Sequence, residues 1–419
     1  MTRRVAVVGA GLAGVTTAYE LATLGCEVHV FERHGSVAEQ ASFAGNALLM
    51  PSLDLPAETA APLSWRWKRW RSARKQQDHS SALAALGQYS LDRCQTLRRS
   101  LGIDDEGAAG LLIPLSDTRA RTHAEAQLAG WRAQGLAVEL LEGDAARRLD
   151  PGLATEAALP AALALRQAGT GNGRLFAQQL RLHAQRAGVR FSFHTTVRSV
   201  ASTAGALNHL RHEYTPPGEA PTVRTGGPRD AGDTLPHTLG PQDERFDAIV
   251  LCNGGAAASL LDRPAAPHFA MLHEASVTAP LRVMEGYPDL GPRAGLLDPQ
   301  RGLAIARIGQ RVRVTGGQVI TATGGSHKPD HEALHRGLQH WYPGSVLHQQ
   351  VQQGQISRPI VVDGLPLLGL SAQPGIWLHI APGWQGWGMA CGAAQLLAQQ
   401  IAGGNPALDI SVFSPQRTI

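Results

Sequence analysis

The sequence predicts an α/β fold with two parts: a parallel sheet assembled from both ends of the chain, and a mainly antiparallel α+β region inserted between them. Two patterns predict the parallel part. An apolar strand at residues 5–8 leads into a glycine-rich turn and a helix, and a second strand–turn–helix pattern covers residues 375–401. Alternating and β-branched residues near positions 275–279, 302–308 and 311–314 predict the antiparallel part.

Length and composition restrict the class of protein. The 419 residues suffice for two domains or one large interleaved unit, and 43% hydrophobic with 17% charged residues is typical of a globular protein. The net charge of +4 favours an anionic surface or substrate and gives no indication of nucleic acid. The four cysteines form no CxxC pair, which favours reduced thiols. Because no apolar run spans a membrane and a core strand already begins at Val5, we expect a cytoplasmic protein.

The strongest motif follows the first strand and contains three glycines. Gly9 suits a tight turn, Gly11 lets the backbone approach a pyrophosphate, and Gly14 allows close packing of helix on strand. The helix that follows points its N-terminal amides at the phosphates. Glu32 ends the next strand, where a carboxylate binds ribose hydroxyls and repels the 2′-phosphate of NADP. The motif predicts dinucleotide binding by Gly9, Ala10, Gly11, Leu12, Ala13, Gly14, Glu32 and Arg33.

FAD and NAD share this fingerprint, and the C-terminal part of the chain favours FAD. The segment Gly383–Met389 opens the last long helix, whose N-terminus would stabilise negative charge on a reduced flavin. A plain glycine-rich turn before a surface helix is the alternative. The predicted cofactor is therefore FAD, with contacts from Gly383, Trp384, Gln385, Gly386, Trp387, Gly388 and Met389.

The remaining patterns predict how the chain is divided. Helices are expected at 82–101, 122–134, 175–187 and 330–341, and strands at 190–193, 197–200 and 248–251. Residues 202–244 are rich in Gly, Pro, Thr and charge, and predict a flexible insertion with at most a weak hairpin. We expect residues 1–60, 150–265 and 355–419 to form the cofactor domain, and residues 61–149 and 266–354 to form the substrate domain.

Blocks along nearly the whole chain resemble the D-amino-acid oxidase superfamily, and within it the small subunits of bacterial D-amino-acid dehydrogenases. Besides the first motif, these blocks are residues 175–200, 247–254, 307–317, 358–369 and 386–392. The resemblance implies an FAD-binding Rossmann-like βαβ fold of the glutathione-reductase type. The family's covalent attachment cysteine is absent near the C-terminus, which implies non-covalent FAD. By position, the resemblance adds cofactor contacts from Ser42, Asn46, Ala47, Val197, Asn253 and Gly254.

Several positions depart from the family pattern. Trp-x-Gly-Leu before the Arg-Pro pair is Gly-Gln-Ile-Ser at 354–357, and Gly-His-Gly before the last helix is Ala-Pro-Gly at 381–383. The Ser-x-x-Asn-x-Gly loop is altered at 42–47, and an expected aspartate is Asn172. These changes surround the flavin and substrate pocket. The sequence therefore indicates the class of reaction more specifically than it indicates the substrate.

Two arginines are candidates for the substrate site. The resemblance implies that Arg358, followed by Pro359, binds the substrate carboxylate, for which a planar guanidinium is well suited. A structural ion pair is the alternative for Arg358. Arg307 ends a strand that faces the same expected cavity, and both a substrate role and a structural role stay open for it. For His273 we expect a structural role.

Two further patterns have competing interpretations. Residues 331–335 fit HExxH, but the helix also carries an apolar packing stripe, and we predict a chance match and no metal. The segment Trp65–Arg71 alternates indoles with cations. It predicts either peripheral contact with the inner face of the cell membrane or a solvated helix whose tryptophans pack inward.

The predicted function is FAD-dependent oxidative deamination of a small amino acid, with a D-amino acid as the substrate that the resemblance implies. Hydride passes from the α-carbon to flavin N5, and the electrons go to quinone or another carrier. The first alternative is a glycine- or sarcosine-type amine oxidase that uses O2. The second is a non-catalytic flavin-binding protein, and a nicotinamide-linked dehydrogenase is a third.

Overall fold

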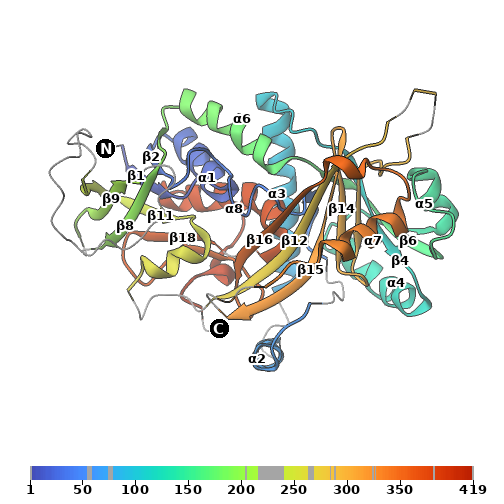
Figure 1. Ribbon diagram of the computed structural model, residues 1–419. Helices are drawn as coiled ribbons and strands as arrows, with labels where there is room; N and C mark the ends of the chain where they lie inside the picture. Colours follow the sequence, from blue (N-terminus) through green and yellow to red (C-terminus); the bar gives the residue numbers. More distant parts are fainter. Residues whose placement is uncertain are drawn as a thin grey trace.

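The structure is a computed structural model that describes residues 2–53, 59–73, 79–202, 205–215, 240–262, 269–283, 285–286, 289–322, 325, 327–380 and 383–417. Figure 1 shows two sheets side by side, with the short α2 (Leu63–Ala73) projecting below them. The mixed α/β class predicted from the sequence is confirmed.

Strands from both ends of the chain form the first sheet, in the order β17-β18-β11-β1-β2-β7. All neighbouring strands run parallel except β17, which is antiparallel to β18. The strands are β1 (Arg4–Val8), β2 (Glu27–Phe31), β7 (Arg190–Ser192), β11 (Ala248–Leu251), β17 (Leu367–Leu370) and β18 (Ile376–Ile380).

Both faces of this sheet are buried, which is why its central strands are apolar throughout. Val5 and Val7 of β1 pack into the core beneath the helices, and Ala6 and Val8 pack into the core on the opposite face. The covering helices are α1 (Leu12–Thr23), α3 (His79–Leu101), α6 (Gly173–Arg186) and α8 (Gly386–Ile401).

A three-stranded antiparallel sheet covers the other face: β8 (Thr195–Ala201), β9 (Asn208–Tyr214) and β10 (Gln242–Phe246). The expectation of only a weak hairpin within residues 202–244 was wrong at its two ends. β9 and β10 form a regular ladder, because Leu210 and Phe246 are buried against the parallel sheet. Residues 216–239 lie outside the described residues, so their predicted flexibility stays a prediction.

The second large sheet has the strand order β16-β12-β15-β14-β13-β4-β6-β3, with β5 paired to β6. Its pairs are antiparallel apart from β4 with β13. The strands are β3 (Leu48–Leu49), β4 (Ala109–Leu115), β5 (Val138–Glu142), β6 (Ala161–Thr170), β12 (Ala270–Pro280), β13 (Gly295–Asp298), β14 (Leu303–Ile308), β15 (Arg311–Ala322) and β16 (Gln352–Ile360).

The remaining helices lie around this second sheet (Figure 1). They are α4 (Thr118–Ala133), α5 (Gly143–Leu149) and α7 (His331–Trp341), and short 3-10 helices occur at η2 (Gly254–Ser259), η4 (His348–Gln350), η5 (Gly383–Gln385) and η6 (Ser411–Phe413). α7 begins after Asp330, whose carboxylate accepts a hydrogen bond from the Ala333 amide.

The chain crosses between the two sheets more often than the sequence indicated. β3 and β6 come from ranges assigned to the cofactor domain, yet both belong to the antiparallel sheet. β16 spans the boundary expected at residue 355. The division into two domains stays a proposal, with these strands on the side of the substrate sheet.

Candidate active site

The glycine turn after β1 requires residues without a side chain. Gly9 has φ +98°, and a Cβ there would lie 3.0 Å from the Asn253 backbone. A Cβ on Gly14 would lie 1.8 Å from the Gly9 carbonyl oxygen, so only glycine allows α1 to pack this closely on β1. The first turn of α1 consequently presents its free amides at the edge of the parallel sheet.

Glu32 follows β2 beside this turn. Its carboxylate accepts hydrogen bonds from the Ala10 amide at 2.6 Å and the His34 amide at 2.9 Å, and the residue is 8% exposed. This fixes the carboxylate where the motif predicts the ribose hydroxyls of a dinucleotide. Arg33 is exposed, and its Nε donates to His34. Arg33 thus lies on the surface beside Glu32, and its contact with the cofactor stays a prediction.

A cavity that is partly open to solvent lies where α1, α8 and the antiparallel sheet meet. Most of its walls come from predicted cofactor residues and from Arg358, but several other residues contribute. The lining residues are Gly11, Leu12, Ala13, Ala41, Ser42, Gly45, Asn46, Ala47, Gly173, Cys252, Gly254, Arg313, Arg358, Pro359, His379, Ile380, Gly383, Gly386 and Trp387.

Buried polar atoms around this cavity have no hydrogen-bond partner among the described residues. They are Asn253 Oδ1, His379 Nε2, Gln385 Nε2 and Trp387 Nε1. Buried polar groups are normally hydrogen-bonded, so this set indicates a ligand rich in donors and acceptors. The orphaned atoms, the free amides of α1 and Glu32 together fit the chemistry of a dinucleotide such as FAD.

The loop at 42–47 closes one side of the cavity. The Leu12 amide donates to Ser42 Oγ at 3.1 Å, so this hydroxyl covers the N-terminus of α1. Asn46 is buried and accepts from the Leu48 amide, and Ala47 has φ +60°. The loop brings Ser42, Asn46 and Ala47 to the cavity wall, and their contact with FAD stays a prediction.

Other predicted cofactor residues support the site from behind. Gly388 packs against Met50, since a Cβ there would lie 2.9 Å from the Met50 oxygen, and Met389 is 3% exposed in the core. Val197 packs beside the core on the far face of the parallel sheet and does not line the cavity. The structure describes no side-chain position for Trp384.

Arg358 lies on β16 at the cavity wall, and its guanidinium is already paired. Its Nη2 donates to Glu274 of β12, which is 2% exposed and also accepts from Gln318 Nε2. The pair is buried, so Glu274 fixes the orientation of Arg358 and offsets its charge.

Arg307 does not line the cavity, and the structure assigns it a structural role. Its Nη1 donates to Asp289 at 2.5 Å, and its Nε donates to the Gly309 carbonyl. Partial burial raises the pKa of Asp289, but the hydrogen bonds from Arg307 and Gly291 outweigh it and hold that pKa below its usual value. Of the two roles left open for Arg307, this ion pair favours the structural one, and the substrate role stays an untested prediction.

The residues that the sequence analysis missed in the cavity wall include an arginine and a histidine. Arg313 of β15 is 8% exposed, and His379 near the end of β18 is 2% exposed. Burial lowers the pKa of His379 to about 4, and its Nδ1 lies 2.9 Å from Thr17 Oγ1. The available signals were a cation alternating with buried valines in 311–314, and a histidine within an otherwise apolar strand.

The two histidine patterns have structural explanations. His331 Nε2 contacts the Gly354 carbonyl at 3.0 Å, and the ring of His335 lies beside that of His348. Within the part of the chain that the structure describes, no three His, Cys, Asp or Glu side chains gather at a metal-binding distance. Both ring nitrogens of His273 contact hydroxyls, those of Ser357 and Thr321, as expected for a structural histidine.

Comparison with known proteins adds a family and a set of similar folds. The family model described as "DAO: FAD dependent oxidoreductase" matches residues 4–400. Glycine oxidase from Geobacillus kaustophilus has a TM-score of 0.71 at 21% identity, covering 100% of both chains. L-proline dehydrogenase from P. horikoshii has a TM-score of 0.72 at 15% identity, covering 99% of this chain and 97% of the other.

A third solved structure of this fold is L-amino acid deaminase from Proteus myxofaciens. Its TM-score is 0.73 at 14% identity, covering 99% of this chain and 93% of that one. At these identities the solved structures establish a shared fold. Among the described residues, no helix is long and apolar enough to cross a membrane.

Proposed function

Because the chain belongs to the DAO family of FAD-dependent oxidoreductases, we propose that it oxidises the C–N bond of a small amino acid, and that a D-amino acid is its substrate. One observation carries this proposal: helix N-termini and buried guanidinium groups surround a single cavity, from the parallel and the antiparallel sheet respectively. FAD binds on the first side, and an anionic substrate fits the second.

Each wall of the cavity has a distinct task in this proposal. The amides of α1 and the carboxylate of Glu32 hold the pyrophosphate and ribose, and the N-terminus of α8 faces the flavin. Arg358 holds the substrate carboxylate, and Glu274 keeps its guanidinium in place. Leu12, Ile380 and Trp387 line the cavity with apolar surface and exclude water.

Orientation matters more than acid–base catalysis in this site. FAD held in this cavity would supply the acceptor for the hydride from the α-carbon, with quinone or another carrier as the final electron acceptor. None of the lining residues is a carboxylate, and burial keeps His379 neutral near pH 7. The substrate amine therefore loses its proton to water before oxidation, and the residues of the cavity position it.

An anaerobic bleaching screen tests the proposal. Purified holoenzyme is mixed without oxygen with D-alanine, D-proline, glycine and sarcosine, and the visible flavin absorbance is followed. We expect a D-amino acid to bleach the flavin, and a quinone dye to restore the colour. No bleaching by any amine would overturn the proposal and leave a non-catalytic flavin-binding protein.

The oxidase alternative gives a different result in the same experiment. Bleaching by glycine or sarcosine, with hydrogen peroxide formed on admission of oxygen, would identify a secondary-amine oxidase. Acid precipitation of the protein completes the test. We expect it to release all of the flavin, because the proposed binding is non-covalent.

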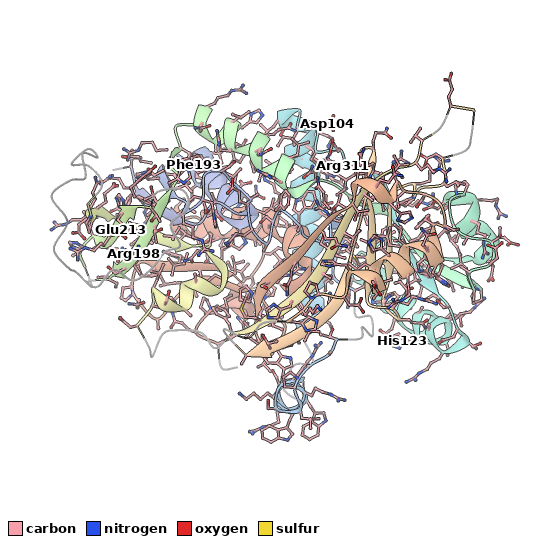
Figure 2. All side chains as sticks on the ribbon, in the orientation of Figure 1. Asp104, His123, Phe193, Arg198, Glu213 and Arg311 are labelled. Carbon is pink, nitrogen blue, oxygen red and sulfur yellow. The ribbon has the colours of Figure 1, made fainter. Side chains whose placement is uncertain are left out.

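We further propose that the cytoplasmic enzyme docks through α2 on the inner face of the cell membrane, where a quinone acceptor would lie. In α2, Leu63 is 79% exposed, Trp67 56% and Trp70 51%, and the Arg71 guanidinium lies 4.7 Å from the centre of the Trp67 ring. Arg66, Lys68, Arg69 and Arg71 are exposed, and the helix contains no acidic residue. Figure 2 shows side chains of the helix that projects below the body of the molecule, which Figure 1 labels α2, pointing away from that body. Indoles suit a bilayer interface, and cations suit anionic headgroups.

Vesicle sedimentation tests this docking. The holoenzyme is expected to sediment with vesicles containing phosphatidylglycerol, and to stay in solution with pure phosphatidylcholine vesicles. Replacing Trp67 and Trp70 together by serine should abolish sedimentation, whereas Leu182→Ser, at an apolar side chain 48% exposed on α6, should not. Equal sedimentation of the Trp67/Trp70 variant and the wild type would contradict the docking role.

A further inference from the structure

Arg313 differs from Arg307, Arg311 and Arg358 because all of its hydrogen-bond acceptors among the described residues are neutral. Its Nε donates to Thr278 Oγ1 at 3.0 Å, and its Nη1 donates to the Phe43 carbonyl at 2.9 Å and the Gly45 carbonyl at 3.3 Å. The side chain thus reaches from β15 to the 42–47 loop and lines the cavity between them.

The charge of Arg313 is uncompensated within the described chain. Arg358 is paired with Glu274, and Arg307 with Asp289, whereas no described carboxylate lies within ion-pair distance of Arg313. Burial lowers the pKa of Arg313 to about 10, with a smaller contribution from Arg311, so the group still carries its charge near pH 7. Leaving a buried charge without a counter-charge is strongly unfavourable.

The guanidinium also keeps hydrogen-bonding capacity on the cavity side. Among the described residues, the structure gives no partner for Nη2, while Nε and Nη1 are both used. A guanidinium has five N–H donors in a planar fork, and a pair of them matches an anionic group with two oxygens. The unused donors and the uncompensated charge belong to the same side chain.

We infer that Arg313 is an anion-binding residue of this cavity, and that its ligand is an anionic oxygen group of the molecules that occupy it. This inference rests on the proposed function, and adds a second anion position to the one proposed at Arg358. The backbones at the two positions are well separated along β12, because Arg313 is opposite Thr278 and Arg358 is opposite Leu272. The six residues from Leu272 to Thr278 correspond to roughly 20 Å along the strand.

Two sources can supply this anion, and they make different predictions. If it belongs to FAD, as a phosphate or as the negative charge of the reduced ring, removal of the Arg313 charge weakens FAD binding or lowers the flavin reduction potential. If it belongs to the substrate, as a second carboxylate, removal of the charge weakens binding of dicarboxylates and leaves FAD affinity unchanged.

The test compares Arg313→Lys, which keeps the charge, with Arg313→Gln, which keeps amide donors and removes the charge. Two measurements concern the cofactor: the dissociation constant of FAD from the protein, and the reduction potential of the bound flavin. The third gives the dissociation constants of glutarate and butyrate, which are titrated without turnover and detected by the change in the flavin spectrum. Arg311→Gln is the matched control, because Arg311 lies on the same strand, is 44% exposed and pairs with Glu106 (Figure 2 labels Arg311).

We expect Arg313→Gln to weaken binding of one anion by about tenfold or more, or to lower the reduction potential, and Arg313→Lys to recover most of the loss. Effects on FAD affinity or potential assign the anion to the cofactor, and a selective effect on glutarate assigns it to the substrate. If Arg313 served only to hold the 42–47 loop by hydrogen bonds, the two variants would rank in the opposite order: Arg313→Gln would be tolerated and Arg313→Lys would be harmful. That order, or no change in any of the three quantities, would overturn the inference.

These results are independent of turnover. If no amine bleaches the flavin, the proposed function fails while the affinities and potential can still be measured. If the variants behave like the wild type, the anion site fails while bleaching can still be observed. Melting temperatures are measured for the apoprotein and for the protein with ligand. If Arg313 binds an anion, Arg313→Gln reduces the stabilisation by the ligand more than it reduces the stability of the apoprotein.

Discussion

The two large sheets contribute to the cavity in different ways. The parallel sheet contributes mainly backbone: a glycine turn at Gly9, the amides of α1 and the N-terminus of α8. The antiparallel sheet contributes side chains, chiefly Arg313 and Arg358. Backbone sites depend on the absence of a side chain at a few positions, whereas side-chain sites depend on charge balance. Mutations should therefore affect the two halves differently: the backbone half through added side chains, and the side-chain half through unbalanced charge.

The largest effect is expected at the backbone half. Gly14→Ala places a Cβ 1.8 Å from the Gly9 oxygen, so α1 must move away from β1. We expect a loss of about 4 kcal/mol or more in the free energy of unfolding, with loss of FAD binding. Thermal denaturation and bound flavin per chain measure both.

A matched control for this prediction lies on the surface. A Cβ on Gly130 of α4 meets no atom within 4 Å, so Gly130→Ala should be neutral or stabilise by up to about 1 kcal/mol. If Gly14→Ala behaved like Gly130→Ala and kept its flavin, the steric basis of the backbone site would be refuted.

The next effect is expected at the side-chain half, through charge. Glu274→Gln leaves Arg358 buried without its carboxylate, which should cost about 3–4 kcal/mol of stability. Adding Arg358→Met removes the buried charge itself and should recover part of that loss, while substrate carboxylate binding stays impaired. Urea denaturation of the two single variants and the double variant measures the coupling. Purely additive losses would show that the pair contributes no coupling.

A pH effect is expected where the halves meet, at His379. Its pKa is about 4 in the folded chain and about 6.5 when unfolded, so only the unfolded state takes up this proton between these values. The stability associated with neutral His379 is complete above pH 6.5 and is lost as the pH falls toward 4, by about 3 kcal/mol. His379→Gln should have a flatter stability profile over this window. An unchanged slope would show that His379 is not buried in its neutral form.

The smallest effect is expected at Arg307, which lies outside the cavity. Arg307→Gln removes a partly buried ion pair with Asp289 and should lower stability by about 1 kcal/mol. Turnover and substrate affinity should stay within roughly twofold of the wild type, since 1.4 kcal/mol corresponds to tenfold. A large increase in KM would return Arg307 to the substrate site.

The same contrast explains what could be predicted from sequence. The glycine turn, Glu32 and the α8 turn are local patterns, because each depends on residues close together in the chain. Arg313 and Glu274 could not be recognised in that way, since their roles depend on cross-strand register and on which carboxylates lie nearby. β6 was missed because its Ala- and Leu-rich strand has no clear alternation, being buried along most of its length.

For Arg307, the sequence pattern of the strand was not enough to predict what the side chain contacts. Its position at the end of a strand left the direction of its side chain undetermined, and the Asp289 that binds it lies in a separate loop. The pairing of β12 with β15 is also irregular between His273 and Ala275, and Glu274 lies at this irregularity, where it accepts from Gln318 Nε2. Such a shift has no signature in the local sequence.

Flavin stoichiometry tests the central claim most directly. The purified chain is measured for visible absorbance, denatured in acid, and the released flavin is quantified against protein. The cavity between the two sheets predicts one FAD per chain, released without a covalent link, and rebinding when FAD is returned to the refolded protein. A colourless chain that takes up no FAD would contradict it.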